Sequence, residues 1–428
     1  MPRLIAAVIL ISNSLAVCTA QAEDLARRVP LNSIRFEKTD WPWWRGPERN
    51  GHATRDQTPP LSWDAEKNVV WKAPVPGRGH GSPIVVGHRV FLATAAMDTH
   101  VQSVICYDRS NGKQIWKTDL HTSIPPKKMN KKASMASSTP ACDGERVFIN
   151  FLHDGAVYTT ALSLDGNPIW QTKITDYQIH QGYGSSPALY ESLVIVSADN
   201  KAGGKVAALD RQNGKIVWEH PRSKDPNYPS PIILKAAGRD QLFLTGLNVV
   251  SSFDPRTGEK LWEHPGATTE CVTSTVTDGN LIFTSGGYPK DHIAAFKADG
   301  SQKGPVWENK SRAYVPSMLI HDGHLYAVLD AGIAMCWKVD SGEELWKKRL
   351  GGTFTASPVL VGENIFATDE DGKTHIFKTS PDGFELVGEN KLGDEVFATP
   401  VICGSRIYTR VAHRNGETRQ EMLYCLGQ

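Results

Sequence analysis

A short phrase ending in tryptophan recurs along this chain of 428 residues and constrains its fold more than any other feature. Most copies have an apolar run, a polar turn with glycine, and a tryptophan four residues after that glycine, as in residues 107–116, 209–218 and 253–262, whereas Gly300 and Trp307 form a looser copy. Successive tryptophans lie 39 to 54 residues apart, at Trp71, Trp116, Trp170, Trp218, Trp262, Trp307 and Trp346. This period is typical of four-stranded β-propeller blades. The phrase therefore predicts one propeller rather than several separate domains.

A second phrase marks the start of each unit and gives the number of units. It is a Ser-Pro or Thr-Pro pair, or a close variant, followed by apolar residues and a turn. Eight copies begin at residues 82, 139, 186, 230, 274, 316, 357 and 399. Proline lacks a backbone N–H, so it suits the first residue of a strand whose channel-side edge is unpaired. These segments are predicted to be the innermost strands of eight blades.

The two ends of the repeat region are predicted to complete one blade between them. The eighth unit ends at residues 424–426 without a tryptophan strand, whereas residues 68–72 form a tryptophan strand with no unit before it. Joining them closes the ring and removes the free sheet edges that an open array would expose. The sequence thus predicts an all-β fold, an eight-bladed β-propeller of four-stranded antiparallel blades closed by an N-terminal strand.

The start of the chain has the form of an export signal. Residues 1–22 contain an early arginine, an apolar run and small residues up to Ala22, after which we expect cleavage. The segment also resembles a lipoprotein signal with Cys18 as the lipidated residue, although Val17 stands where that signal has a smaller side chain. No later apolar run approaches the roughly 20 residues that span a bilayer. The mature chain is therefore expected in the periplasm or outside the cell, with no transmembrane segment.

A segment between the signal and the repeats is rich in tryptophan. Residues 23–62 are expected to form an N-terminal extension packed on a propeller of residues 63–428. Trp41, Trp43 and Trp44 lie within four residues of one another, and each side chain is costly to leave in water. We expect them to pack on the outside or the base of the ring, the alternative being an exposed patch that binds a partner.

The cysteines carry no motif for a metal or for redox chemistry. Apart from Cys18 there are six, at positions 106, 142, 271, 336, 403 and 425, and none forms a CxxC pair. Three of them, Cys106, Cys336 and Cys425, occupy the small buried position of a repeated strand. Free buried thiols are therefore expected, with a Cys403–Cys425 disulfide as the alternative in an oxidising compartment.

The charge balance narrows the classes of partner. The chain has 47 basic and 46 acidic residues, a formal net charge of +1. No overall field would draw nucleic acid or an anionic membrane to it. We expect a monomer that meets any charged partner through a local surface.

The repeat resembles that of secreted bacterial quinoprotein-like β-propellers, the pyrroloquinoline-quinone type. The resemblance rests on residues 208–218 and 253–262, where Asp precedes a Gly turn and a Trp, and on the opening residues 40–47. It covers roughly residues 40–428. In the family the tryptophans dock neighbouring blades, so the resemblance implies a structural role for them here.

The resemblance leaves two classes of function open. One is an exported, non-catalytic binding or scaffold propeller for a small molecule, glycan or protein, similar in repeat type to the lipoprotein that assists outer-membrane barrel assembly. The other is a pyrroloquinoline-quinone-dependent oxidoreductase, in which the quinone lies over a calcium ion held by six to eight oxygens. No catalytic Asp or calcium ligand set can be matched residue by residue, and the adjacent cysteine pair of many such enzymes is absent. We expect no cofactor and no metal, with the quinone and calcium as the alternative.

Any ligand is expected at the channel mouth, where the innermost strands begin. The connections into those strands are rich in aromatic and charged residues, which suits a concave site with convergent polar groups. Tyr183 is the first choice because its flanking glycines would expose the ring, and Arg312 suits a carboxylate or phosphate. The alternative is that these side chains only fill the channel. The predicted residues are His80, Gln181, Tyr183, Tyr228, Glu270, Arg312, Tyr314, Phe354, Glu395 and Phe397.

Overall fold

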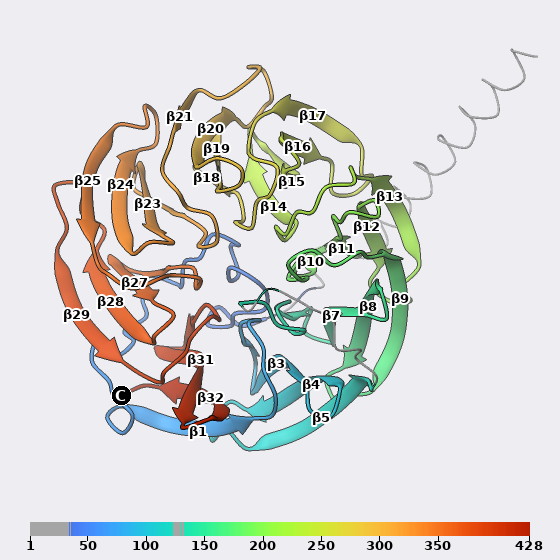
Figure 1. Cartoon of the computed structure of the whole chain (residues 1–428), viewed down its shortest axis with the longest axis vertical. Helices are drawn as coiled ribbons and strands as arrows, with labels where there is room; N and C mark the ends of the chain where they lie inside the picture. Colours follow the sequence, from blue (N-terminus) through green and yellow to red (C-terminus); the bar gives the residue numbers. More distant parts are fainter. Residues whose placement is uncertain (1–33, 35, 123–129, 131) are drawn as a thin grey trace, which may run out of the picture.

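The computed structural model describes residues 34, 36–122, 130 and 132–428, which form a ring of eight four-stranded antiparallel sheets (Figure 1). The predicted eight-bladed propeller is therefore confirmed. Strands are the only regular elements of these residues, and none of their segments is a helix long and apolar enough to cross a membrane. The expected cleavage after Ala22 and the lipid site at Cys18 lie outside the described residues.

Each blade runs from an innermost strand beside the channel to an outermost strand on the rim, and we number the blades in chain order. Blades 1 to 4 consist of β2 (Ile84–Val86), β3 (Arg89–Ala96), β4 (Val101–Asp108), β5 (Gln114–His121), β6 (Ala141–Cys142), β7 (Arg146–His153), β8 (Ala156–Ser163), β9 (Pro168–Asp176), β10 (Ala188–Tyr190), β11 (Leu193–Ser197), β12 (Lys205–Asp210), β13 (Ile216–Pro221), β14 (Ile232–Ala236), β15 (Arg239–Gly246), β16 (Val249–Phe253) and β17 (Lys260–Pro265). Blades 5 to 7 consist of β18 (Val276–Thr277), β19 (Leu281–Gly286), β20 (His292–Lys297), β21 (Trp307–Asn309), β22 (Leu319–His321), β23 (His324–Leu329), β24 (Ile333–Lys338), β25 (Glu344–Arg349), β26 (Val359–Val361), β27 (Asn364–Thr368), β28 (Lys373–Lys378) and β29 (Leu386–Lys391).

Blade 8 closes the ring because it takes strands from two distant parts of the chain. Its first three strands are β30 (Val401–Cys403), β31 (Arg406–Asn415) and β32 (Thr418–Leu426). The fourth is β1 (Val69–Val75), which pairs antiparallel with β32 and places Trp71 opposite Cys425. The predicted closure by an N-terminal strand is confirmed.

The repeated tryptophan and glycine meet across blade boundaries rather than within one blade. Trp170 of blade 2 donates from Nε1 to the Arg211 carbonyl of blade 3 at 3.2 Å. A Cβ on Gly214, in the same blade 3 turn, would lie 2.5 Å from the Trp170 ring, and the glycine has a left-handed φ of +73°. An indole-to-carbonyl bond of this kind joins six more pairs of neighbouring blades, and its donors are Trp71, Trp116, Trp218, Trp262, Trp307 and Trp346.

Hydroxyl groups link the innermost strands where they begin. The Ser186 N–H donates to Ser230 Oγ of the next blade at 2.9 Å. Five similar bonds run from Ser82 to Thr139, Thr139 to Ser186, Ser274 to Ser317, Ser317 to Ser357 and Ser357 to Thr399. They satisfy backbone amides that would otherwise face the channel without a partner. The Ser or Thr of the second phrase is therefore an interblade link, and we call these residues the hydroxyl ring.

Residues 41–53 lie along the innermost strands and cross the middle of the ring in Figure 1. Trp41 exchanges two backbone hydrogen bonds with Val85 of β2, at 2.8 and 3.0 Å. At the other end of the segment, the Ala53 N–H donates to the Leu360 carbonyl of β26 at 2.8 Å. The segment thus pairs with innermost edges in blades 1 and 7, which the repeats leave unpaired.

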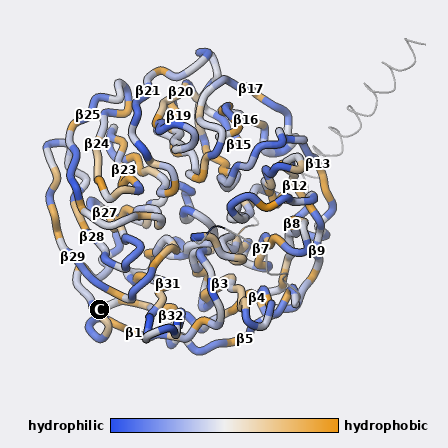
Figure 2. Tube along the Cα trace, in the orientation of Figure 1, coloured by the Kyte–Doolittle hydropathy of each residue, from blue (hydrophilic) through white to orange (hydrophobic). Residues whose placement is uncertain are grey.

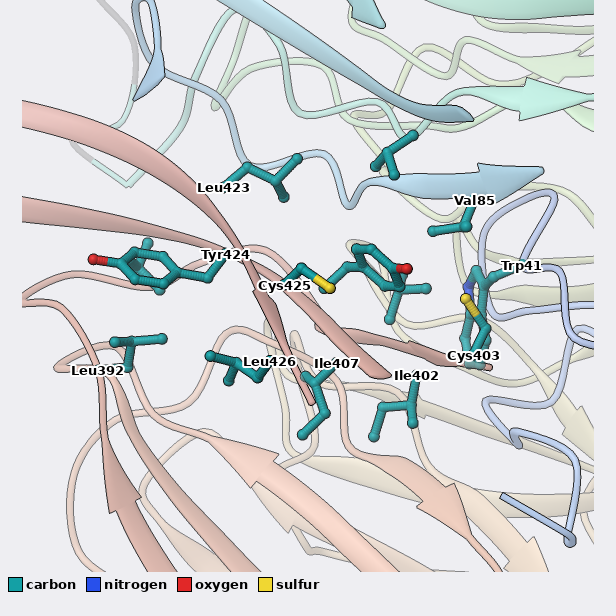
Figure 3. Packing of buried hydrophobic residues seen from close by; sticks show 14 of the residues in the cluster. Trp41, Val85, Leu392, Ile402, Cys403, Ile407, Leu423, Tyr424, Cys425 and Leu426 are labelled. Atoms are coloured by element: carbon teal, nitrogen blue, oxygen red, sulfur yellow. The ribbon is translucent and has the colours of Figure 1, made fainter. Parts of the chain in front are cut away.

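The tryptophans of this segment pack inside the ring. Trp41 and Trp43 are buried, and Figure 3 shows Trp41 beside Val85 and Cys403 in an apolar cluster that spans blades 7, 8 and 1. Trp44 donates from Nε1 to Ser274 Oγ of the hydroxyl ring at 2.8 Å. The three tryptophans therefore pack on the propeller rather than form an exposed patch. They do so along the innermost strands, so the expectation that they pack on the outside of the ring is wrong.

Apolar residues gather in the strands and polar ones in the connections (Figure 2). The six cysteines among the described residues, Cys106, Cys142, Cys271, Cys336, Cys403 and Cys425, are all buried free thiols. The prediction of free thiols is confirmed, and Cys403 and Cys425 do not pair.

Candidate functional site

The ten residues predicted for the site all lie on what we call the leading loops, the connections that enter the innermost strands. Because every innermost strand begins on the same face of the ring, the leading loops share that face, which we call the mouth. Residues 41–53 contact β2 and β26 further along those strands. The mouth is therefore the face that carries the side chains of the leading loops, which differ from blade to blade.

Three of the predicted residues converge on one side of the mouth, on the leading loops of blades 4, 5 and 6. The Tyr314 hydroxyl donates to Glu270 Oε2 at 3.3 Å. His180, from the leading loop of blade 3, places Nδ1 3.5 Å from Glu270 Oε1 and 3.1 Å from the Tyr228 hydroxyl. The Glu270 side chain is 7% exposed, whereas both tyrosines are half-buried. We call Glu270, His180, Tyr228 and Tyr314 the Glu270 cluster.

Burial and charge within the Glu270 cluster shift the pKa values of its two tyrosine hydroxyls in the same direction. Desolvation, and then the Glu270 carboxylate, raise the pKa of Tyr228 and of Tyr314 above the ordinary value for tyrosine. Both hydroxyls are therefore neutral at physiological pH and act as hydrogen-bond donors or acceptors rather than as bases.

Arg312 borders this cluster but is already bound. Its guanidinium lies 5.2 Å from the centre of the Tyr314 ring. It donates to the Gly287 carbonyl at 2.9 Å and to Asp291 Oδ1 at 3.0 Å. Arg312 is exposed, although part of its donor set is used within the chain.

A second cluster surrounds Glu395 on the leading loop of blade 8. Its carboxylate accepts from Arg414 at 2.5 Å and from Arg419 at 2.9 Å, and the Arg78 guanidinium lies 3.5 Å away. Burial alone would raise the pKa of Glu395, but the hydrogen bonds from Arg414 and Arg419 lower it below the ordinary value for glutamate. We call Glu395 and these arginines the Glu395 cluster.

Two more predicted residues, His80 and Phe397, pair beside the Glu395 cluster. Their rings are stacked with centroids 4.3 Å apart. Burial, followed by nearby arginines, holds the pKa of His80 well below its ordinary value. His80 is therefore neutral, and its buried Nε2 has no hydrogen-bond partner among the described residues.

Of the remaining three predicted residues, Gln181 adjoins the Glu270 cluster through a backbone contact with the Tyr228 hydroxyl, whereas Phe354 and Tyr183 lie apart from both clusters. Gln181 Oε1 accepts from Asn130 Nδ2 at 2.8 Å, and Phe354 is 1% exposed within an apolar cluster of blades 6 and 7. Tyr183 is also buried, and its hydroxyl donates to the Ser197 carbonyl at 3.1 Å. The expectation that flanking glycines expose the Tyr183 ring is wrong, because the backbone freedom they give lets the ring turn into the core of blades 2 and 3.

Sequence reasoning missed the partners that complete each cluster. His180 lies next to Gln181 on a leading loop, so its place near the mouth could have been predicted from the sequence. Arg414 and Arg419 lie near the tip of the β31–β32 hairpin, far from the leading loops in sequence, and no spacing rule connects them with Glu395.

The donor set does not fit a calcium-bound quinone. Calcium takes six to eight oxygens, usually with several carboxylates, yet no group of three His, Cys, Asp or Glu side chains that could hold a metal occurs in the described part of the chain. Glu270 and Glu395 lie in separate clusters with different partners. The residues present thus give no basis for a catalytic step through such a group.

Eight blades linked by tryptophan and glycine, with irregular leading loops at one face, define a PQQ-like repeat propeller. The chain belongs to the family described as outer membrane protein assembly factor BamB, whose profile matches residues 53–178, 100–348 and 321–383. It is similar to outer membrane protein assembly factor BamB of Bordetella pertussis, with 24% identity over 354 residues that cover 78% of this chain and 81% of that protein.

Solved structures show the same fold at low identity. The crystal structure of BamB from Moraxella catarrhalis has a TM-score of 0.58 and 14% identity, covering 83% of this chain and 96% of that one. Quinohemoprotein alcohol dehydrogenase from Comamonas testosteroni has a TM-score of 0.64 and 13% identity, covering 95% and 84%. One propeller thus occurs in an assembly factor and in an enzyme, so the fold does not choose between the two functions.

Proposed function

We propose that this chain is an exported, non-catalytic scaffold propeller that presents its mouth to a protein partner in the periplasm. Membership of a family named for outer membrane protein assembly supports a role in binding other proteins. The sequence of residues 1–22, with its form of an export signal, supports the location.

The use of the mouth carboxylates carries this proposal. A general base in an oxidoreductase needs a carboxylate that is free to take a proton from substrate. Glu395 is bound by three arginines, and Asp199 by Arg222 at 3.1 Å. Asp330 accepts from the backbone N–H of Tyr314 at 2.7 Å. These three carboxylates brace the mouth, which suits a rigid binding face, whereas Glu270 has no permanently charged partner among the described residues.

The exposed residues of the mouth are of the kinds that protein interfaces favour. Tyr288 is 55% exposed, and the side chains of Arg312 and Arg414 are 46% and 57% exposed. Tyrosine and arginine are enriched at the centres of protein interfaces, where they supply a large part of the binding energy. A mouth that carries them suits a protein partner better than a catalytic pocket.

The test is site-specific photocrosslinking in the cells that make the protein. A photoreactive amino acid replaces Tyr288 or Arg414 at the mouth, and Asn280 in the β18–β19 turn at the opposite face serves as the matched control. We expect discrete protein adducts from the two mouth positions and none from Asn280. Adducts from all three positions, or from none, would refute the proposal.

The alternative, a quinone-dependent oxidoreductase, predicts a different result in a separate experiment. Purified mature protein is titrated with pyrroloquinoline quinone and calcium while quinone absorbance and melting temperature are followed. The scaffold proposal expects no saturable change in either signal. Saturable binding at micromolar quinone, with a rise in melting temperature, would favour the enzyme.

A further inference from the structure

Two glutamates occupy the same place in different blades. Glu270 lies four residues before Ser274, and Glu395 lies four residues before Thr399, both members of the hydroxyl ring. Each also forms an antiparallel bridge to the middle hairpin of its own blade, Glu270 with Tyr288 and Glu395 with Ala412. The repeat therefore holds both glutamates at equivalent positions of the mouth, and their surroundings can be compared directly.

The two carboxylates differ in how their charge is balanced. Glu395 contacts three guanidinium groups that are always charged, those of Arg78, Arg414 and Arg419. Within the part of the chain that the structure describes, the ion pair of Glu270 is with His180, which is charged only when protonated. Its other hydrogen-bond partner is the neutral Tyr314 hydroxyl. Glu270 thus lacks the permanent cations that its counterpart has.

Burial makes this difference important. An ionised carboxylate withdrawn from water is unfavourable unless a cation or several hydrogen bonds compensate it. The Glu270 side chain is 7% exposed, slightly less than the 12% of Glu395. Arg312 does not supply the missing charge, because its guanidinium is bound to Asp291 and the Gly287 carbonyl.

The rings around Glu270 indicate which cation would suit it. Tyr228 and Tyr314 border the carboxylate and are half-buried. Phenol rings beside a carboxylate attract organic cations through the ring quadrupole as well as through charge. The described residues place no third His, Cys, Asp or Glu beside Glu270 and His180 to hold a divalent metal. The chemistry is that of a site for a guanidinium or alkylammonium group.

We propose that the Glu270 cluster binds an arginine or lysine side chain of the protein partner, between the Glu270 carboxylate and the rings of Tyr228 and Tyr314. The inference rests on the proposed scaffold function, because it names the group through which the partner is held. The partner's cation would balance the charge of Glu270 in blade 5, as three arginines balance the charge of Glu395 in blade 8.

The inference can be tested without knowing the partner. The probes are N-acetyl-arginine methylamide and its citrulline analogue, which has the same shape without the charge, titrated by ligand-observed NMR at low salt. We expect saturable binding of the arginine probe, at least tenfold weaker binding of the citrulline probe, and at least tenfold weaker arginine binding to Glu270→Gln. Glu343→Gln, which removes an exposed carboxylate on blade 6, is the matched control and should bind arginine as the wild type does.

Two outcomes would overturn the inference: equal binding of the two probes, or unchanged arginine binding to Glu270→Gln. If Glu270→Gln fails to fold, Tyr228→Leu removes a ring and leaves the carboxylate in place. That variant should weaken arginine binding several-fold with little change in citrulline binding, and an unchanged affinity counts against the site.

Crosslinking separates this inference from the proposed function. Adducts from Tyr288 that disappear in Glu270→Gln support both. Adducts that persist in Glu270→Gln leave the scaffold function intact and reject the cation site. No adduct in the wild-type background rejects the scaffold function, while the arginine titration still decides whether the cation site exists.

Discussion

The contact between Gly214 and Trp170 gives a quantitative test of how the blades are joined. Replacing Gly214 by alanine has two costs. The first is the left-handed backbone, φ +73°, which costs an L-residue about 1–2 kcal/mol. The second is the new Cβ, which would lie 2.5 Å from the Trp170 ring. That ring cannot turn away without losing the Nε1 bond to the Arg211 carbonyl, and overpacking of this kind costs about 1–3 kcal/mol.

Gly238 provides the matched control. Its φ is +79°, and a Cβ there would meet nothing within 4 Å. Gly238→Ala should therefore cost only the backbone term, about 1–2 kcal/mol, whereas Gly214→Ala should cost about 2–5 kcal/mol. Urea unfolding at 25 °C measures both, with the comparison valid where the m-value is unchanged.

A double variant isolates the interblade contact itself. In a Trp170→Ala background the Cβ at position 214 meets no ring but still lies 2.7 Å from Thr172 Oγ1. The cost of Gly214→Ala should therefore fall toward that of Gly238→Ala and stay somewhat above it. If the two glycine variants lose equal stability, or if the cost at Gly214 does not depend on Trp170, the reasoning about blade docking is wrong.

Three further predictions concern single side chains. Glu421→Gln should cost about 3–5 kcal/mol in urea unfolding, because the Arg410–Glu421 pair is buried, with both side chains 2% exposed, and the arginine would keep an uncompensated charge; a loss below 1 kcal/mol would show that the pair is solvated. Trp44→Phe should lower stability by about 1 kcal/mol through the lost bond to Ser274, and an unchanged urea midpoint would contradict that bond. Burial, and then His153, lower the pKa of His121 to about 4, so the unfolded chain binds the proton first and stability should fall as pH drops from 6.5 to 4. His121→Gln should reduce that slope in melting temperature, and an identical slope would show that His121 does not contribute to it.

The repeat made the blades predictable because its residues have the same structural role in every copy. The tryptophan and glycine of each phrase, such as Trp170 and Gly214, mark where one outer strand packs on the next turn. Their spacing therefore predicts strand order, blade number and closure. It did not predict that the tryptophan packs on the following blade's glycine, because sequence distance cannot tell the two neighbours apart.

The mouth was only partly predictable, since its chemistry lies in residues that do not repeat. Glu270 and Glu395 stood out because the leading loops could be located from the repeat. Their partners came from other elements, such as Arg414 from the β31–β32 hairpin, and no periodicity marks them. Tyr183 shows the opposite error, since adjacent glycines were taken to expose a ring that tertiary packing buries.

The chain's own N-terminal segment makes the channel wall differ from the mouth. Residues 41–53 pair with the innermost edges of blades 1 and 7 and bond through Trp44 to the hydroxyl ring, so part of the channel wall is occupied within the molecule. At the mouth, by contrast, six hydroxyl links join neighbouring leading loops where the innermost strands begin, while the residue four positions earlier varies, from Arg78 to Glu270 to Glu395. A rigid frame with variable side chains on one face is suited to one-sided recognition. Under the proposed scaffold function, specificity depends on which of these positions has its charge balanced within the chain. Glu270, whose charge has no permanent partner among the described residues, is then the position at which we propose a partner is recognised.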